Sequence, residues 1–244
     1  MENMYALVTG GSRGIGRAVA VKLARMGYKV VINYRSNEEE ARRTLDMIRE
    51  AGSEGELLPF DVGDAQAVQQ ALEGWQQSHP DDYIEVLVNN AGIRKDNLLI
   101  WMEPQDFDAV ITTNLRSFYN VTRPLLTPMI RHKYGRIVNM ASLSGLSGMS
   151  GQCNYSAAKG GLIAATKALA QEVAKKNVTV NAVAPGFVRT EMVDGLDENE
   201  LKRAIPMQRF GTPEEVAEVV GFLASRGASY VTGVCISVNG GLYT

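Results

Sequence analysis

The stretch Thr9-Gly10-Gly11-Ser12-Arg13-Gly14-Ile15-Gly16 follows an apolar run, residues 5–9, and precedes an amphipathic run, residues 17–26. Its glycines allow a sharp turn from strand to helix, and they let an anion approach the free N–H groups of the helix N-terminus. The spacing is T-G-x-x-x-G-x-G rather than G-x-G-x-x-G, because Val19 stands where the third glycine would be. A tight turn without a ligand is the alternative, but the strand before and the helix after favour a phosphate-binding turn.

Short apolar runs alternate with longer amphipathic runs along the rest of the chain. Strands are expected at 5–9, 29–34, 55–59, 84–89, 136–140, 178–184 and 234–238. Helices are expected at 17–26, 37–51, 64–78, 104–132, 152–175 and 213–225. Continuous apolar strands that alternate with helices predict an α/β fold, a Rossmann-type doubly wound domain with a seven-stranded parallel sheet and helices on both faces.

The domain organisation is expected to be simple, with residues 1–244 forming a single domain. No Pro/Ser-rich linker, low-complexity tract or repeat divides the chain. The least regular segment, Pro185 to Gly211, follows a strand end, where open α/β sheets bind ligands. We therefore expect a substrate lid at about 189–211, with a short helix at about 197–204. Some of its apolar side chains should face the substrate: Met192, Leu196, Leu201, Ile205, Met207 and Phe210.

Composition excludes several classes of protein. The chain has 244 residues, a formal net charge of -2, two cysteines and two histidines. Two cysteines cannot build a disulfide scaffold, and no Cys/His spacing suggests zinc. Near-neutral charge argues against a dedicated nucleic-acid binder. There is neither a signal peptide nor an apolar run of the ~18 residues that a membrane span requires. We expect a cytoplasmic protein with no metal, no nucleic-acid partner and no membrane association.

The end of the second strand indicates which dinucleotide the turn would bind. A site for NAD commonly has a carboxylate there, which accepts a hydrogen bond from the ribose 2′-hydroxyl. This chain has Asn33-Tyr34-Arg35-Ser36 instead. Arg35 and Arg13 would offer two guanidinium groups to a 2′-phosphate. The alternative is that both are solvated surface arginines, but their positions, without the acid, favour NADP(H).

The candidate chemistry lies at the start of the predicted helix 152–175. Tyr155 and Lys159 are four residues apart and so share a helix face, where the ammonium would lower the pKa of the phenol. A phenol tuned in this way is a plausible general acid for an alkoxide formed by hydride arrival. Ser142, which ends the fifth strand, can fold back to the same cleft and hold a carbonyl oxygen. Asn114 is a polar residue in an apolar helix pattern, and it equally fits helix bending or a buried backbone hydrogen bond.

With these features the sequence resembles the short-chain dehydrogenase/reductase family over essentially its whole length. The matching motifs are Thr9-Gly10-x-x-x-Gly14-x-Gly16, Asp61-Val62, Asn89-Asn90-Ala91-Gly92, Asn114, Ser142, Tyr155-x-x-x-Lys159 and Pro185-Gly186-x-x-x-Thr190. The resemblance implies that Asp61 and Val62 bracket the adenine, Asn90 lines the cofactor cleft and Val188 contacts the nicotinamide amide. It also implies that Tyr155 is the acid/base, that Lys159 binds the nicotinamide ribose, that Ser142 positions the substrate carbonyl and that Asn114 holds a water in a proton relay.

Within the family the chain is most similar to the 3-oxoacyl-[acyl-carrier-protein] reductases, over 90–99, 151–155, 183–187 and 238–243. This similarity implies reduction of a carrier-bound 3-ketoacyl chain with NADPH in fatty acid, polyketide or polyene synthesis, by a homotetramer. Gln152 is expected beside Ser142 and Tyr155 in the substrate site. Lys133 and Lys176 stand where the subgroup has arginines that dock the acyl carrier protein, although dipole-matched cations at helix ends explain them equally. Reduction of a free ketone, sugar or steroid, or an inert NADP sensor, are the alternatives.

Overall fold

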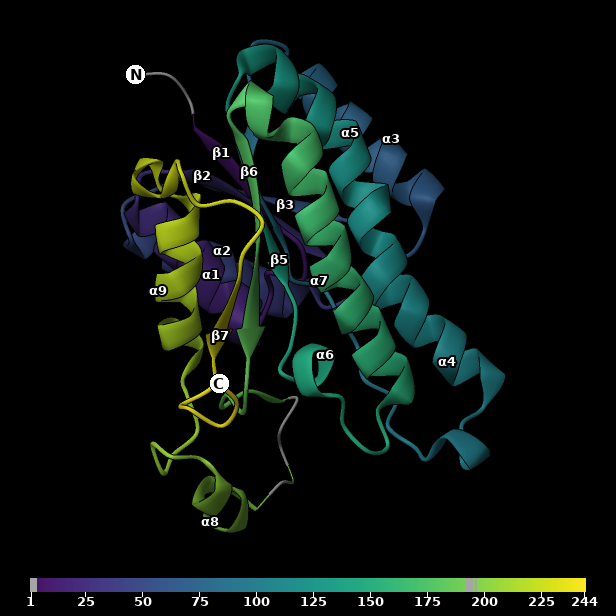
Figure 1. The fold of residues 1–244 in the computed structure, drawn as a ribbon. Coiled ribbons are helices and arrows are strands. Elements are labelled where there is room, and N and C mark those ends of the chain that lie inside the picture. The colour runs from purple at the N-terminus through teal and green to yellow at the C-terminus, as the bar shows by residue number, and fades with distance from the viewer. Residues whose placement is uncertain (1–3, 192–194, 196) are drawn as a thin grey trace.

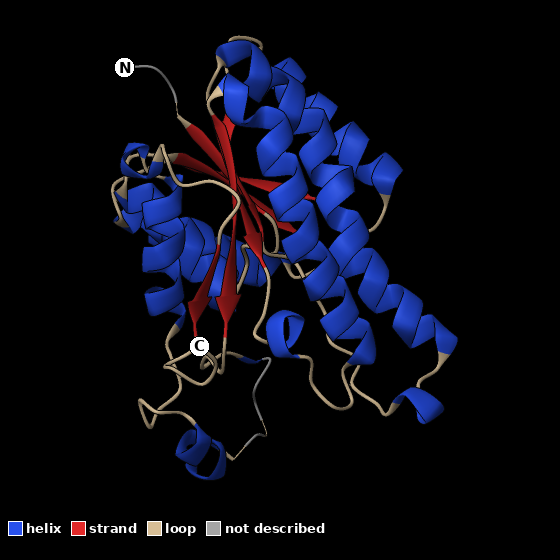
Figure 2. Ribbon diagram, viewed as in Figure 1, coloured by secondary structure: helices blue, strands red, loops and turns tan. Residues whose placement is uncertain are grey.

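The computed structural model describes residues 4–191, 195 and 197–244. Within these residues the chain forms one parallel, seven-stranded sheet in the order β3-β2-β1-β4-β5-β6-β7 (Figures 1 and 2). The strands are β1 (Tyr5–Val8), β2 (Lys29–Tyr34), β3 (Gly55–Pro59), β4 (Ile84–Asn89), β5 (Gly135–Met140), β6 (Val178–Pro185) and β7 (Cys235–Val238). The predicted fold class is confirmed, and each predicted strand is present within one residue at either end.

The strand order creates a switch point beside β1. The chain first builds outward from β1 through β2 to β3, and it then returns to add β4 on the other side of β1. Val8 is therefore flanked by Ile32 on β2 and by Val88 on β4. Ligands of doubly wound sheets bind outside the carboxyl ends of the strands at such a reversal. The glycine-rich turn after β1 lies at this place.

The helices cover both faces of the sheet, as Figure 1 shows. They are α1 (Gly14–Arg25), α2 (Glu38–Glu50), α3 (Ala65–Ser78), α4 (Pro104–Ile111), α5 (Ser117–His132), α6 (Ser144–Ser147), α7 (Cys153–Val173), α8 (Glu198–Leu201) and α9 (Pro213–Ala224). Helices α1, α2 and α9 pack on one face, while α3, α5 and α7 pack on the other. Successive β2 residues alternate between these two cores: Val30 and Ile32 belong to the first, and Val31 belongs to the second. Burial on both faces explains the continuous apolar strand runs.

The predicted helix 104–132 is interrupted, and the prediction of one regular helix was wrong. Residues Thr112–Arg116 form a π-helical turn between α4 and α5. Within this turn the Asn114 side-chain Nδ2 donates to the carbonyl oxygen of Val110, four residues earlier, at 2.9 Å. A polar side chain that binds a helix carbonyl competes with the regular backbone ladder. Such π turns are frequently found at functional sites.

The predicted lid, 189–211, is described except for residues 192–194 and 196, so Met192 and Leu196 lie outside the described residues. The predicted short helix is present as α8 followed by a 3₁₀ turn, Lys202–Ala204. Asp197 caps it, because its side chain accepts hydrogen bonds from the backbone N–H groups of Asn199 and Glu200. Two backbone hydrogen bonds close the base of the segment, from Arg189 to Gly211 and from Gly211 to Phe187.

The apolar side chains of this segment differ in role. Ile205 and Phe210 are buried, and Phe210 stacks on Phe187 with ring centroids 5.2 Å apart. They therefore hold the segment against the domain rather than facing a ligand. Met207 is exposed and free to contact a substrate.

Three general features of the described residues bear on function. None of their helices is both long and apolar enough to cross a membrane. Within the same ranges, no His, Cys, Asp and Glu side chains gather in a group that could hold a metal ion. Cys153 and Cys235 are both free thiols.

Candidate active site

The glycine-rich turn folds back tightly on itself. Gly10 and Gly14 have φ values of +62° and +53°, which favour glycine. A β-carbon on Gly16 would collide with the carbonyl oxygen of Gly10. Helix α1 begins within this stretch, at Gly14, and no side chain caps its first N–H groups. These N–H groups and the helix dipole make a site that fits the pyrophosphate of a dinucleotide.

Two asparagines hold this turn in place. The Asn33 Oδ1 accepts from the N–H of Gly10 at 3.2 Å. The Asn90 Nδ2 donates to the carbonyl oxygens of Thr9 and Gly10 at 2.9 and 3.1 Å. The N–H of Ala91 donates to the Thr9 hydroxyl at 3.0 Å, which ties the end of β4 to the turn. Asn90 and Ala91 thus border the predicted cleft, and Asn33 is a functional residue that sequence reasoning missed.

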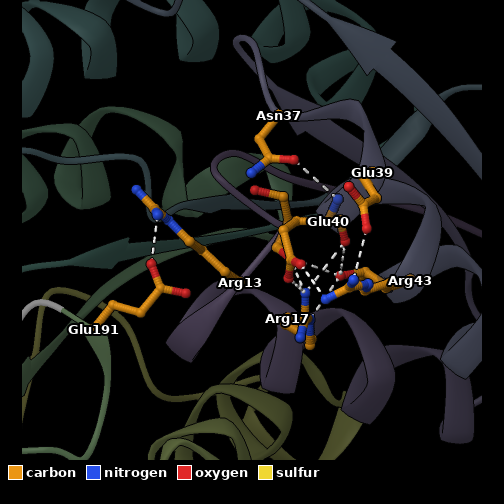
Figure 3. Close-up of polar contacts among 9 residues, drawn as sticks. Arg13, Arg17, Asn37, Glu39, Glu40, Arg43 and Glu191 are labelled. Carbon is orange, nitrogen blue, oxygen red and sulfur yellow. Dashed lines mark hydrogen bonds and ion pairs between the residues drawn. The ribbon is translucent and has the colours of Figure 1, made fainter.

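Arg17 is a second residue that sequence reasoning missed (Figure 3). Its Nη2 donates to the carbonyl oxygen of Ser12 at 2.6 Å and to the Glu40 carboxylate at 2.5 Å. Its Nε donates to the hydroxyl of Thr44, which is buried. Arg17 therefore clamps the turn to α2. The signal available in the sequence was the acidic first turn of the predicted helix 37–51.

The two arginines predicted to bind a 2′-phosphate lie at the carboxyl edge of the sheet, each beside a carboxylate. The Arg13 Nη1 is 2.5 Å from the Glu191 Oε2 (Figure 3). The Arg35 Nη1 is 3.7 Å from the Oδ2 of Asp61. Both side chains are exposed, at 61% and 66% of their surface, so both guanidinium groups are open to solvent.

The residues predicted beside the adenine differ in exposure. The Oδ1 of Asp61 accepts from the N–H of Gly63 at 2.8 Å, which fixes the carboxylate next to Arg35. The Val62 side chain is instead buried in the core under α3 and α5. Its carbonyl oxygen accepts from the Asn120 Nδ2 at 3.0 Å.

Asn89 lies in a buried chain of hydrogen bonds that links β4 and β5 to two helices on one face of the sheet. Its Nδ2 donates to Thr122 on α5 at 3.0 Å and to the Oδ1 of Asn139 on β5 at 2.9 Å. Asn139 donates in turn to Thr166 on α7 at 2.8 Å. This polar chain joins two helices to the central strands. The side chain predicted to bind the cofactor is therefore engaged inside the core.

Tyr155 and Lys159 lie together in the first turns of α7, and both are buried. The Lys159 Nζ is 5.6 Å from the centroid of the Tyr155 ring, and it donates to the carbonyl oxygen of Met140 at 2.7 Å. Ser142 follows β5 and hydrogen-bonds to the phenol. The structure thus brings the three predicted catalytic side chains to one place at the carboxyl edge.

The electrostatics of this pair differ from the expectation. Burial raises the pKa of the Tyr155 phenol above its usual value, and the hydrogen bond from Ser142 opposes this only in part. Burial also lowers the pKa of Lys159 to about 8. The predicted lowering of the phenol pKa was wrong, because withdrawal from water outweighs the nearby charges. The Tyr155 phenol is therefore protonated at neutral pH.

Asn114 completes the cluster from the π turn. Its Nδ2 donates to the carbonyl oxygens of Ile93 and Val110, both at 2.9 Å. Its Oδ1 is buried without a hydrogen-bond partner and lies over Gly92, next to the Nζ of Lys159. The alternatives weighed for Asn114, bending and a backbone hydrogen bond, are both realised. The unpaired oxygen is available for a donor such as water.

A chain of polar side chains runs from the surface to Ser142. The Asp96 carboxylate accepts from Arg94 at 2.8 Å and from the Gln152 Nε2 at 2.9 Å. The Gln152 Oε1 accepts from the Ser144 hydroxyl at 2.8 Å. The backbone N–H of Ser144 donates to the Ser142 Oγ at 3.2 Å. Because Ser142 accepts there, its own proton points to another acceptor. Asp96 and Arg94 were not predicted.

The segment after β6 closes over the glycine-rich turn. A β-carbon on Gly186 would lie 2.8 Å from the Asn239 Cβ, so only glycine permits this close packing. The Val188 side chain is buried in the core. The methyl group of Thr190 lies 3.4 Å from the position of a β-carbon on Gly14. Within the predicted segment Pro185 to Thr190, Thr190 therefore borders the glycine-rich turn directly.

Lys133 and Lys176 lie together at the opposite edge of the sheet. Lys133 lies two residues before Gly135, and Lys176 lies two residues before Val178. Gly135 and Val178 are partners in the sheet. Tyr155 is in the first turn of α7, whose 21 residues are about 30 Å long, and Lys176 follows the last turn of that helix. In one chain these lysines are therefore remote from the cluster of Tyr155.

Comparison with known proteins agrees with this geometry. A family model described as Enoyl-(Acyl carrier protein) reductase matches residues 10–243. A protein from Aggregatibacter actinomycetemcomitans is 46% identical over 238 residues, which are 97% of this chain and 98% of the relative. One from Pseudomonas aeruginosa is 45% identical over 246 residues, covering 100% and 98%. One from Staphylococcus epidermidis is 41% identical over 244 residues, covering 99% of both. All three are named 3-oxoacyl-[acyl-carrier-protein] reductase FabG.

Proposed function

The chain belongs to the short-chain dehydrogenase/reductase family, and on that premise we propose that it reduces the 3-keto group of an acyl chain carried by acyl carrier protein. The product is the 3-hydroxyacyl form, as in fatty acid synthesis or a related polyketide or polyene pathway. The observation that carries this proposal is the buried phenol of Tyr155, which lies beside Lys159 and Ser142 at the carboxyl edge of the sheet.

The proposed cofactor is NADPH, bound by a single domain of residues 1–244 with a substrate lid at about 189–211. The glycine-rich turn and the uncapped start of α1 fit its pyrophosphate. Arg13 and Arg35 support the preference for the 2′-phosphate, since no acid ends β2. The cofactor supplies the hydride for the keto carbon.

The proton for the new hydroxyl comes from Tyr155. As the ketone oxygen gains negative charge, the phenol donates its proton to that oxygen. Ser142 orients the oxygen, because its Oγ accepts from the N–H of Ser144 and its hydroxyl proton is directed elsewhere. Both donors stabilise charge that develops only during the reaction.

Lys159 and Asn114 support the phenol. Lys159 is held by the carbonyl oxygen of Met140, and its remaining N–H groups suit the hydroxyls of the nicotinamide ribose. Its positive charge favours the phenolate that forms after proton transfer. The unpaired Oδ1 of Asn114 suits a water that returns a proton toward this pair.

The proposal is tested by NADPH oxidation with a panel of thioesters. We expect the highest kcat/KM with 3-ketoacyl chains on acyl carrier protein, and lower values with free thioester analogues. Free ketones, sugars and steroids cover the alternative small-molecule reductase. A 2-enoyl thioester tests for enoyl reduction, the activity named in the description of the matched family model. Equal turnover of free and carrier-bound substrates contradicts the carrier assignment, and failure to oxidise NADPH with any of them leaves the sensor alternative.

Carrier docking at Lys133 and Lys176 is proposed to serve a neighbouring copy of the chain. Lys176 follows the end of α7, about 30 Å from Tyr155 along that helix, and Lys133 precedes the strand partner of the same end. A carrier docked at the two lysines is therefore far from the phenol of the same chain. We expect Lys133→Glu with Lys176→Glu to raise the KM of the carrier-bound substrate. The KM of a free thioester should stay unchanged.

A homotetramer is proposed as the assembly. Tyr119 on α5 and Phe222 on α9 are exposed aromatic side chains on opposite faces of the sheet. An exposed aromatic side chain on each face suits two different two-fold contacts, which together generate a tetramer. Light scattering should give four chains for the native protein and two for Phe222→Glu. A cytoplasmic location belongs to the same proposal, supported by the two free cysteines.

A further inference from the structure

Two arginines of the glycine-rich turn, Arg13 and Arg17, are bound very differently (Figure 3). Arg17 donates to Ser12, Glu40 and Thr44 and is only 25% exposed. It is part of the scaffold and cannot turn to a ligand without releasing the turn. Arg13 pairs with a single carboxylate, Glu191, and both partners are about 60% exposed. Arg13 is therefore the cation that can exchange partners.

Glu191 reaches Arg13 from the far end of the chain, 178 residues away in sequence. It directly follows Thr190, whose methyl group lies against Gly14. The segment before it is fixed, because Val188 bridges to Gly211 and Arg189 pairs with Glu198 at 2.7 Å. The carboxylate is therefore held beside the guanidinium by the fold and not by a chance side-chain encounter.

We propose that Glu191 is a specificity-determining residue, which competes with the 2′-phosphate of NADP(H) for Arg13. This inference rests on the proposed preference for NADPH. A phosphate offers more negative charge and more acceptor oxygens than a carboxylate, so it takes the guanidinium from Glu191. The displaced carboxylate then lies near a second anion and is repelled.

The competition acts on one form of the cofactor only. NADH carries a neutral 2′-hydroxyl, which has no charge to displace Glu191 from Arg13. Binding of NADH therefore leaves the pair intact, while binding of NADPH breaks it. Glu191 consequently weakens the affinity for NADPH without a matching effect on NADH. Because exposed ion pairs are weak, the expected effect is about two- to fivefold in Kd.

The test is a titration of NADPH and NADH against the native protein, Glu191→Gln, Arg13→Gln and the double variant, followed by nicotinamide fluorescence. We expect Glu191→Gln to lower the Kd of NADPH about two- to fivefold and to leave the Kd of NADH unchanged. In the Arg13→Gln background the same substitution should have a smaller effect on NADPH, because no ion pair has to be broken there. The difference in NADPH Kd between Glu191→Gln and the native protein should shrink at high salt, because the ion pair of Arg13 and Glu191 is exposed.

Glu218→Gln is the matched control. It removes the same charge from another ion pair, with Lys22 two turns further along α1, in which the carboxylate is 66% exposed and the lysine 26%. It should leave both Kd values unchanged. An unchanged NADPH Kd in Glu191→Gln overturns the inference, and so does equal tightening of NADH. If the native protein shows no preference for NADPH, the proposed cofactor is wrong and the inference falls with it. The first two outcomes leave the proposed cofactor standing.

Discussion

The carboxamide oxygen of Asn114 lies 2.5 Å from the position that a β-carbon on Gly92 would occupy. The Lys159 Nζ is 3.5 Å from the same point. The absence of a side chain at Gly92 is therefore what lets the π turn approach the start of α7. The two groups that flank the phenol meet over one glycine.

Gly92→Ala should consequently displace Asn114 and reduce kcat about 10- to 100-fold, since small misplacements at a reacting centre are costly. Overpacking should also lower the free energy of unfolding by about 1–3 kcal/mol. Steady-state kinetics and urea unfolding measure both. Gly74→Ala is the control, because Gly74 lies in α3 with open space around it. It should keep full activity and gain about 0.5–1 kcal/mol. A fully active Gly92→Ala enzyme would show that Asn114 can move without consequence.

Tyr155→Phe removes the proton donor while keeping the buried ring. We expect kcat to fall about 10²- to 10⁴-fold, the range for loss of a general acid. NADPH should still bind with nearly native affinity, as measured by fluorescence titration. Tyr230→Phe, at a fully exposed position, is the matched control. Retained turnover in Tyr155→Phe would remove this residue from the acid role.

The two directions of the reaction should respond differently to pH. The pKa of Tyr155 is raised above its usual value, so the neutral phenol needed for ketone reduction is present throughout the neutral range. Reduction should be constant up to about pH 8 and decline as Lys159 loses its charge. Alcohol oxidation needs the phenolate, so its rate should rise with pH across the same range. Rates of both reactions between pH 6.5 and 10 test this, and an oxidation rate independent of pH contradicts it.

Lys159→Met should stabilise the protein at neutral pH while abolishing turnover. Burial lowers the Lys159 pKa from 10.5 to about 8, which corresponds to roughly 3 kcal/mol of cost below pH 8. The Met140 carbonyl loses its donor, so we expect a net gain of about 1–2 kcal/mol. Between pH 8 and 10.5 the folded native protein releases this proton before the unfolded chain does. Its stability therefore rises with pH relative to the variant.

Urea unfolding of both proteins at pH 7 and pH 10 measures this difference. Lys159→Met should be the more stable protein at pH 7, and the native protein should be the more stable by about 1 kcal/mol at pH 10, because most of the cost of the buried ammonium is gone there. A variant that is less stable than the native protein at both values would mean that the buried ammonium is fully compensated.

Asp96→Asn should raise the KM of the keto substrate about tenfold and leave NADPH binding unchanged. An amide in place of the carboxylate turns a donor toward Arg94 or Gln152, so the orientation of Gln152 is lost. Asp106→Asn removes the same charge from an exposed pair with Lys95 and is the control. Equal effects of both substitutions would indicate a general charge effect rather than positioning of Ser142.

Sequence reasoning located the parts of the site that depend on local spacing. The glycine-rich turn, the pair Tyr155 and Lys159, and Ser142 at a strand end all follow from short motifs. Contacts between distant segments were not accessible. Arg17 meets Glu40 across 23 residues, and Gln152 meets Asp96 across 56. No local pattern specifies such partners.

The wrong predictions for the Tyr155 pKa and for the regular helix 104–132 have a related cause. The direction in which the Tyr155 pKa shifts depends on how far the fold withdraws the phenol from water. The degree of burial of one side chain cannot be read from composition. The π turn at Asn114 depends on a carbonyl of the opposite segment, Ile93, as well as on its own helix. Element types were therefore predicted well, whereas burial and helix irregularity required the folded arrangement.

The buried polar chain from Thr122 through Asn89 and Asn139 to Thr166 has a consequence for inactivation. It fastens the helices on which the reacting groups depend to the two central strands. Loosening either helix would leave amides unpaired inside the protein, at a cost of about 1–3 kcal/mol for each group. Heat should therefore abolish catalysis and secondary structure at the same temperature. Residual activity after heating would thus report the fraction of molecules still folded.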